Sequence, residues 1–338
     1  MTQVLGIVKE GKLIPENLWI KYVTSLQNDF DSLETNNERA KRELAEAIIQ
    51  AIKKRTASCL RVHEMNASEL RASKRARSLA GRAFSHATQA REQLPKFGVL
   101  FSGGVDSSLI AFVSKQLKSN FTCYTVGIAN SNDIIWAQKV ANEYKFNFKY
   151  KILSLDEFKI VVKNVVKLLN DADFVKVSVG SVLYAAGKLA LANGDKNLFV
   201  GLGSEELFAG YQRHEDAFQG SNFEALHKEC WNGLKNMWSR DLVRDFTIAK
   251  ALRLNLMTPF LDKDLIKTAM NIHPMLKLDK NHKKIILRES AEFIGLKKEF
   301  AWRKKQAAQY GSNFVNGIDK LARGNGFKFK KEYLQSLL

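Results

Sequence analysis

A segment rich in glycine and hydroxyl groups follows the short apolar run 97–101, and it consists of Ser102, Gly103, Gly104, Val105, Asp106, Ser107 and Ser108. Adjacent glycines allow positive φ and let an anion approach the main chain, while N–H groups at the start of a following helix point at that anion. Ser107 and Ser108 add hydroxyl donors, and Asp106 adds a hard oxygen ligand of the kind that Mg²⁺ prefers. The segment therefore predicts a site for phosphate groups and a divalent cation.

Strands and helices are expected to alternate around this segment. Apolar runs predict strands, and helical spacing of apolar residues predicts helices between them. The strands are expected at 97–101, 121–128, 146–153 and 197–202, and the helices at 107–117, 134–144, 156–169 and 181–192. This order is typical of right-handed βαβ units, so it predicts an α/β fold with a doubly wound parallel sheet. Ligands of such sheets bind at the carboxyl ends of the strands, where Ser102 to Gly104 lie.

Four segments are expected along the chain. Residues 1–57 hold a short strand at 4–8, a turn and then a helix, because apolar residues recur every three or four positions from Ala40 to Ile52. Residues 58–95 are rich in Arg, Ala and Ser, and we interpret them as a candidate inserted basic arm, either helical or disordered. Residues 96–222 form the α/β core. Residues 223–338 are expected to be mainly α-helical and to complete the site.

Composition limits the class of protein. The 338 residues are 45% hydrophobic and 26% charged, which suits a globular chain with one large α/β domain and a smaller partner. The chain contains no run of about 18 apolar residues, and its first ten residues do not resemble a signal peptide, so we expect a cytoplasmic protein without a membrane partner. The three cysteines, Cys59, Cys123 and Cys230, are far apart, which favours reduced thiols over a zinc site or a disulfide framework.

The formal net charge of +18 makes tRNA or another nucleic acid a candidate partner, because such a field attracts polyanions. The basic residues are spread along the sequence, with short clusters at 53–55, 303–305 and 328–331. A solvated Lys-rich surface explains the same charge without any partner.

A second glycine loop and two further blocks carry a family resemblance. The second loop is Gly201-Leu202-Gly203-Ser204-Glu205-Glu206-Leu207-Phe208-Ala209-Gly210-Tyr211, and the further blocks are Pro259-Phe260-Leu261-Asp262 and Lys284-Ile285-Ile286-Leu287-Arg288-Glu289. With the first loop, they make the chain resemble the PP-loop ATP pyrophosphatases, whose fold is adenine nucleotide alpha hydrolase-like. More narrowly, the chain resembles the synthetase domain of asparagine synthetase and its relative β-lactam synthetase.

The resemblance implies a function and a set of site residues. Such enzymes split ATP into AMP and pyrophosphate to adenylate a carboxylate, which then passes to ammonia or an amine, so ATP and Mg²⁺ are the implied cofactors. Asp106 and Glu205 are the implied metal ligands, and Lys284 is implied to stabilise charge at the α-phosphate. Besides the first loop, the residues assigned to nucleotide binding are Leu100, Val126, Gly127, Gly201 and Gly203.

The departures from the family pattern concern the acceptor and the nitrogen source. Residue 2 is Thr2, so the N-terminal cysteine of a glutaminase is absent; ammonia, a separate glutaminase subunit or an amine substrate is expected to supply nitrogen. Leu202 stands where asparagine synthetases have a catalytic glutamate, and Asn255 and Met257 stand where they have a Glu-x-Arg pair. An apolar side chain cannot accept a proton from an amine. Glu206 is the candidate that would replace the missing acid.

Three functions follow from these residues. The first is an AMP-forming, ATP-dependent carbon–nitrogen ligase. The second is a PP-loop enzyme that activates a tRNA base. The +18 charge and the basic residues Arg303 to Lys305 favour this function, and the absence of paired cysteines for sulfur transfer disfavours it. The third is a non-catalytic nucleotide-binding protein, suggested by Leu202 but disfavoured by the intact first loop.

Overall fold

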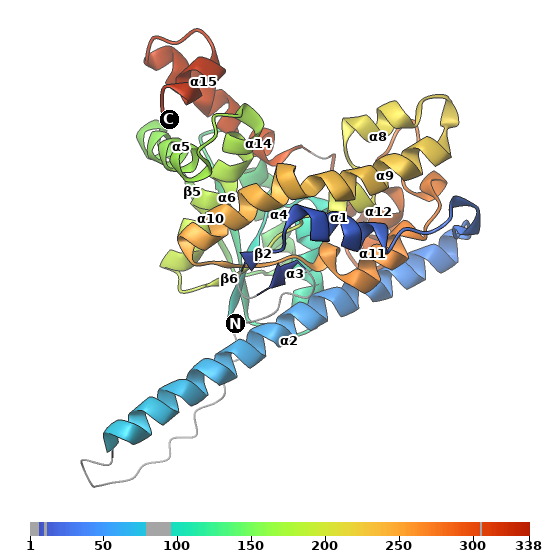
Figure 1. Ribbon diagram of the computed structural model, residues 1–338, viewed down its shortest axis with the longest axis horizontal. Helices are drawn as coiled ribbons and strands as arrows, with labels where there is room; N and C mark the ends of the chain where they lie inside the picture. The colour runs from blue at the N-terminus through green and yellow to red at the C-terminus, as the bar shows by residue number, and fades with distance from the viewer. Residues whose placement is uncertain (1–6, 10–11, 79–95, 305) are drawn as a thin grey trace.

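The computed structural model describes residues 7–9, 12–78, 96–304 and 306–338, and a parallel sheet lies at its centre (Figure 1). Its strands are β3 (Phe97–Leu100), β4 (Phe121–Gly127), β5 (Phe148–Ile152), β6 (Asn197–Phe199) and β7 (Asn255–Met257). They lie in the order β5-β4-β3-β6-β7, and all pairs are parallel. The two glycine loops follow β3 and β6, which are neighbours in the sheet. This strand order brings both loops to the same place on the carboxyl edge.

Helices cover both faces of the sheet. Successive strand residues point to opposite faces, so Phe199 and Met257 belong to one buried cluster, and Leu198 and Leu256 belong to the other. The core helices are α3 (Val105–Gln116), α4 (Asn132–Tyr144), α5 (Leu155–Leu169) and α6 (Phe174–Ala192). The α/β fold class expected from the sequence is confirmed, and each of the four expected strands and helices overlaps an observed one.

Helix α6 is long and apolar enough to cross a bilayer when it is judged by length and composition alone. Its packing is that of a core helix. It contacts α5, α10 and β4, and its buried positions include Val177, Leu183 and Ala186. Burial inside the protein therefore accounts for its apolar composition.

The N-terminal segment packs directly on the α/β core. It comprises the hairpin of β1 (Val8–Lys9) and β2 (Lys12–Leu13), α1 (Glu16–Thr24), a 3-10 turn (Phe30–Ser32) and α2 (Asn37–Ser78). The expected amphipathic helix is confirmed in α2, where Leu44 and Ile52 are fully buried. The indole N–H of Trp19 in α1 donates to the carbonyl of Leu234, 2.8 Å away. Residues 4–6 of the expected strand lie outside the described residues.

Helix α2 continues without a break from Asn37 to Ser78, and its second half extends away from the rest of the molecule (Figure 1). The first part of the candidate arm 58–95 is therefore a continuation of this helix. Residues 79–95 lie outside the described part of the chain. The boundary at 57/58 stays a prediction.

The C-terminal part is mainly helical but contributes the edge strand β7, which sequence reasoning did not identify. Three residues between long helical stretches are too few to show a strand pattern. The α-helices from the second glycine loop onward are α7 (Ser204–Leu207), which lies within the loop, α8 (Gln212–Ala217), α9 (Phe223–Met237), α10 (Val243–Leu252), α11 (Lys263–Met270), α12 (Ile285–Ile294), α13 (Lys298–Ala301), α14 (Ala308–Gly311), α15 (Phe314–Gly324) and α16 (Lys330–Gln335). A π-helical turn (Trp238–Leu242) joins α9 to α10, and 3-10 turns span Gln219–Ser221, Pro259–Leu261 and Pro274–Leu276.

Lys277, directly after the last of these 3-10 turns, is fully buried. Its ammonium donates to the sulfur of Met270, 3.8 Å away, and burial lowers the pKa of Lys277 to about 8. An unfolded lysine has a pKa of about 10.4. Between these two values the unfolded chain binds more protons than the folded chain, so the free energy of unfolding rises with pH across this window and the burial cost is greatest below it.

We expect Lys277→Met to raise the free energy of unfolding at pH 7 by about 3 kcal/mol, the cost of burying the charged form. The gain should shrink as pH rises from 7 to 9.5, because wild type then loses its buried charge. Urea unfolding at several pH values measures this difference. Lys263→Met, at an exposed position on α11, is the control and should show no such trend. A gain in the free energy of unfolding that is the same at every pH would contradict the lowered pKa of Lys277 as its cause.

Candidate active site

The first glycine loop is braced by its own side chains. Gly103 has a φ of +69°, and a Cβ there would lie 2.8 Å from the backbone nitrogen of Ala137, so only glycine fits between the loop and α4. The Ser102 N–H donates to the Ser107 hydroxyl oxygen at 3.2 Å, and that hydroxyl donates to the Gly104 carbonyl at 3.2 Å. These contacts leave the start of α3 directed at the carboxyl edge of the sheet, as an anion site requires.

The second loop packs against the first. Gly203 has a φ of +95°, and a Cβ there would lie 2.4 Å from the Leu261 side chain of the Pro-Phe-Leu-Asp block. A Cβ on Gly201 would lie 3.2 Å from the Cβ of Asp106. At this contact the Ser204 hydroxyl donates to Asp106 Oδ1 at 2.5 Å. The loop thus reaches the first helical turn of α3, where Asp106 lies.

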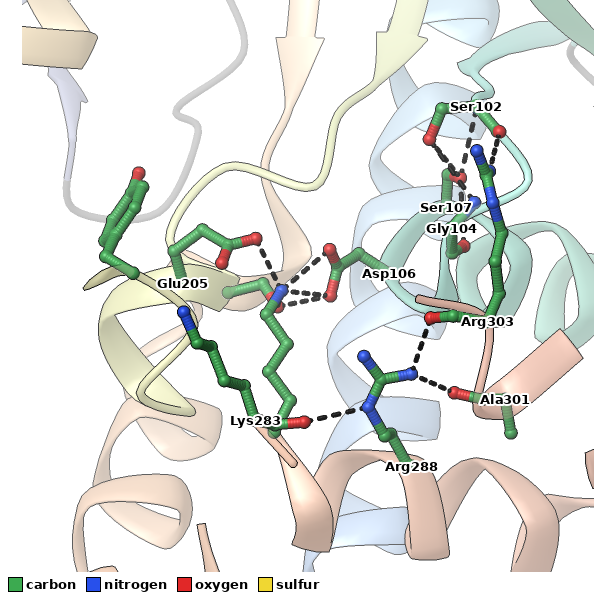
Figure 2. Close-up of polar contacts among 12 residues, drawn as sticks. Ser102, Gly104, Asp106, Ser107, Glu205, Lys283, Arg288, Ala301 and Arg303 are labelled. Carbon is green, nitrogen blue, oxygen red and sulfur yellow. Dashed lines mark hydrogen bonds and ion pairs between the residues drawn. The ribbon is translucent and has the colours of Figure 1, made fainter. Parts of the chain in front are cut away.

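Lys284 joins the two loops. It has a φ of +59° at the start of α12, and its side chain is only 1% exposed. Its Nζ lies 2.8 Å from each oxygen of Asp106, 2.6 Å from Glu205 Oε1 and 3.1 Å from the Ser204 hydroxyl. The carboxylates of Asp106 and Glu205 point toward each other across this nitrogen (Figure 2). Burial lowers the pKa of Lys284, and the charge of Asp106 opposes that shift.

The structure therefore brings together three predicted site residues that are far apart in the sequence. Asp106 lies 178 positions before Lys284, and Glu205 lies 79 positions before it. Two carboxylates around one cationic centre are a fitting donor set for Mg²⁺, which takes hard oxygen ligands. No group of three or more His, Cys, Asp or Glu side chains within the described ranges could hold a metal ion.

Two buried arginines line the cavity beside the first loop, together with Ser102, Gly104, Val105, Asp106, Asp133 and Gln306. Arg288 donates to three carbonyls, those of Lys283 at 2.8 Å, Ala301 at 2.6 Å and Arg303 at 3.0 Å. Arg303 donates to the Ser102 carbonyl, as Figure 2 shows. It also donates to Asp133 at 2.9 Å. Burial lowers the pKa of both arginines. Their charges and N–H groups make the cavity suitable for anionic oxygens.

Sequence reasoning did not assign Arg288 and Asp133 to the site. Arg288 lies four residues after Lys284 in the same block, and its backbone N–H donates to the Lys284 carbonyl at 3.0 Å, so both residues lie at the first turn of α12. The four-residue spacing from Lys284 could therefore have indicated that Arg288 belongs to the site. Asp133 carries no motif, and only the fold brings it to Arg303.

Four other residues predicted to bind the nucleotide, Leu100, Ser108, Val126 and Gly127, do not line this cavity. Val126 is buried, and Gly127 ends β4, where a Cβ would lie 3.0 Å from the carbonyl of Ser312. Leu100 ends β3 directly before the first loop, and Ser108 is fully buried in α3. The end of β4 is thus packed against the C-terminal segment that carries Arg303.

Glu206 is not part of the Lys284 cluster. Its carboxylate is 1% exposed and is bound by Arg240 of the π-helical turn, with Arg213 3.6 Å away. Burial raises the pKa of Glu206, and the charge of Asp241 adds to the rise. These contacts join the second loop to the junction of α9 and α10. Its candidate role in accepting a proton stays a prediction.

Three residues, Leu202, Asn255 and Met257, differ from the family pattern on the side expected to bind the acceptor. Leu202 is partly buried and packs against both core clusters, one on each face of the sheet. On β7, Asn255 donates to the side-chain oxygen of Asn197 at 2.9 Å, and Met257 is 2% exposed. Where a Glu-x-Arg pair is expected, this chain therefore has an amide paired with another amide, and a buried thioether.

Gly210 directly contacts the Lys284 cluster. A Cβ there would lie 1.8 Å from Glu205 Oε2 and 2.6 Å from Lys284 Cε. Both atoms belong to flexible side chains, so Gly210→Ala should displace them while sparing the fold. We expect ATP turnover to fall by roughly 10²-fold, the scale of a misplacement of about 1 Å, with little change in melting temperature.

Steady-state kinetics and thermal unfolding measure the two effects of Gly210→Ala. The control is Gly324→Ala at the end of α15, where nothing lies within 4 Å of the added Cβ. Wild-type turnover in the Gly210 variant would show that the Lys284–Glu205 contact is not needed for activity.

Comparisons with known proteins agree with this geometry. A model of the asparagine synthase family matches residues 77–225 and 219–324. A putative glutamine-hydrolyzing asparagine synthetase of Methanocaldococcus jannaschii is 32% identical over 309 residues, which cover 81% of this chain and 57% of that protein. The glutamine-hydrolyzing asparagine synthetase of Homo sapiens is 32% identical over 256 residues, covering 71% of this chain and 43% of its own.

Asparagine synthetase B of Escherichia coli, also glutamine-hydrolyzing, is 29% identical over 241 residues, covering 67% of this chain and 43% of its own. The chain spans about half the length of these relatives. The family match includes both glycine loops and the block that carries Lys284, the segments that meet at the cluster described above. The chain therefore belongs to the asparagine synthase family.

Proposed function

We propose that this chain is an AMP- and pyrophosphate-forming ligase that adenylates a carboxylate and transfers the acyl group to ammonia or an amine. The observation that carries this proposal is the convergence of both glycine loops on Lys284, with Asp106 and Glu205 within 2.8 Å of its nitrogen. The family of the chain supports ATP-dependent amidation. Such an arrangement stabilises charge that develops at a phosphorus centre.

Different residues of the site would bind different parts of Mg·ATP. Main-chain N–H groups of the first loop and the start of α3 bind phosphate oxygens, and Arg288 and Arg303 face the same cavity with two positive charges. Asp106 and Glu205 would hold Mg²⁺, which supplies charge neutralisation, with phosphate oxygens and water completing its ligands. Lys284 would then stabilise negative charge at the α-phosphate.

The acceptor side argues for a substrate other than aspartate. Leu202 is apolar where an acid would accept the amine proton, and Asn255 and Met257 cannot form an ion pair with an amino-acid head group. These neutral side chains favour a less polar carboxylate, or a larger substrate with its own recognition surface.

The proposed reaction needs a source of nitrogen. The relatives are named as glutamine-hydrolyzing, and this chain spans about half of their length. We propose that a separate glutaminase subunit, free ammonia or an amine substrate supplies the nitrogen. We also propose that the protein acts in the cytoplasm.

The test is exchange of labelled pyrophosphate into ATP with a panel of carboxylates, because adenylation is reversible before acyl transfer. We expect exchange that depends on one class of carboxylate and is abolished in Asp106→Ala. The control is Asp156→Ala, which removes an acid at the equivalent place of α5, the second residue of the helix, on an exposed surface. Circular dichroism should show both variants folded. Full exchange in Asp106→Ala would remove this residue from the site.

With Mg·ATP, aspartate and ammonia, we expect little or no asparagine. Leu202 provides no proton acceptor for the amine, and Asn255 and Met257 provide no ion pair for the head group. Amino-acid analysis of the reaction mixture, with AMP measured in parallel, checks this outcome. Robust formation of asparagine together with AMP would instead make the protein an ammonia-dependent asparagine synthetase, and Glu206 would then be the acid to test.

A further inference from the structure

The ammonium of Lys284 fills the gap between the two carboxylates proposed to bind metal. Its nitrogen contacts four oxygens: both of Asp106, Oε1 of Glu205 and the hydroxyl of Ser204. An ammonium has three protons, so these contacts use its full donor capacity. Asp106 and Glu205 lie on different helices, α3 and α7, and both carboxylates contact the ammonium of Lys284.

Lys284 and a divalent cation cannot occupy this gap together. Mg²⁺ binds oxygen at about 2.0–2.1 Å and would use the same carboxylate oxygens. Those oxygens now lie 2.6 to 2.8 Å from an ammonium nitrogen. Two cations at such separation in a buried site repel each other strongly. One must leave before the other can bind.

The main chain on both sides of Lys284 is held by hydrogen bonds. The Lys283 carbonyl accepts from Arg288 at 2.8 Å, and the Ile285 N–H donates to the carbonyl of Lys277 at 2.9 Å. These contacts fix the turn on both sides of Lys284. The four-carbon stem can then carry the ammonium from the carboxylates to a nearby anion without movement of the backbone.

We propose that Lys284 is a positioning residue that holds Asp106 and Glu205 together while the nucleotide is absent, and that Mg²⁺ enters only with ATP, whose phosphate oxygens take over the ammonium. This inference rests on the proposed Mg·ATP site. It sets an order of binding: the nucleotide-free protein has a low affinity for free Mg²⁺, because an internal cation already neutralises much of the carboxylate charge. A nucleotide without metal meets a site whose carboxylates are still masked by lysine.

The test measures metal binding without nucleotide and needs no enzyme activity. Titration calorimetry with MgCl₂ should show weak binding to wild type and a Kd lower by roughly tenfold or more for Lys284→Met, since removal of the ammonium exposes both carboxylates. Millimolar MgCl₂ should raise the melting temperature of Lys284→Met by several degrees and leave wild type nearly unchanged. Lys284→Gln, which keeps the polar contacts without the charge, is expected to behave like Lys284→Met.

Two further variants make the result specific. Lys283→Met removes one positive charge next in sequence, where Lys283 pairs with Glu215 at 3.0 Å, and should bind Mg²⁺ as weakly as wild type. Adding Glu205→Gln to Lys284→Met should abolish the gain, because one of the two exposed ligands is lost.

Equal Mg²⁺ affinity in wild type and both Lys284 variants would overturn the inference. So would variants that stay unfolded both with and without MgCl₂, because a metal could then not replace the lysine. Neither result depends on pyrophosphate exchange. The proposed ligase activity can therefore fail or succeed separately from this inference.

Discussion

The buried ammonium of Lys284 is the interaction on which the site depends. Asp106 and Glu205 are two like charges at adjacent helix starts, and without a cation between them their repulsion would separate the two glycine loops. The lysine satisfies both carboxylates at 2.6 to 2.8 Å and is nearly excluded from solvent. Because burial of its charge is costly, the lysine depends on these oxygens to remain buried.

The position of each glycine follows from this contact. Gly201 lets the second loop approach Asp106, and Gly210 lets Lys284 and Glu205 lie against the main chain. Gly203 turns the chain with positive φ beside Leu261, which directs Ser204 and Glu205 toward the first loop. A larger residue at Gly201 or Gly210 would fill space next to these charged side chains, and one at Gly203 would collide with Leu261. The glycines thus permit close approach of charged groups as well as turns.

The C-terminal half of the chain contributes residues to the candidate nucleotide site. It supplies Lys284 and Arg288 from α12 and Arg303 from the segment after α13, and the strand β7 extends the sheet beside β6. Arg288 ties the turn before α12 to the segment that carries Arg303 through three carbonyls. The π-helical turn at Trp238–Leu242 similarly places Arg240 on Glu206 of the second loop.

The sequence alone determined the α/β fold and the family, and it predicted a phosphate loop, because these depend on local patterns: short apolar runs, helical spacing and adjacent glycines before a helix start. The same patterns could not show β7, which has three residues, or the continuity of α2 to Ser78 across an apparent change in composition. Only the tertiary structure shows that Lys284 lies between Asp106 and Glu205. It also shows that Arg288 and Asp133 line the cavity and that Arg240 forms an ion pair with Glu206. Each of these contacts joins residues from separate segments, and their meeting depends on strand order and helix packing, which a local pattern does not encode.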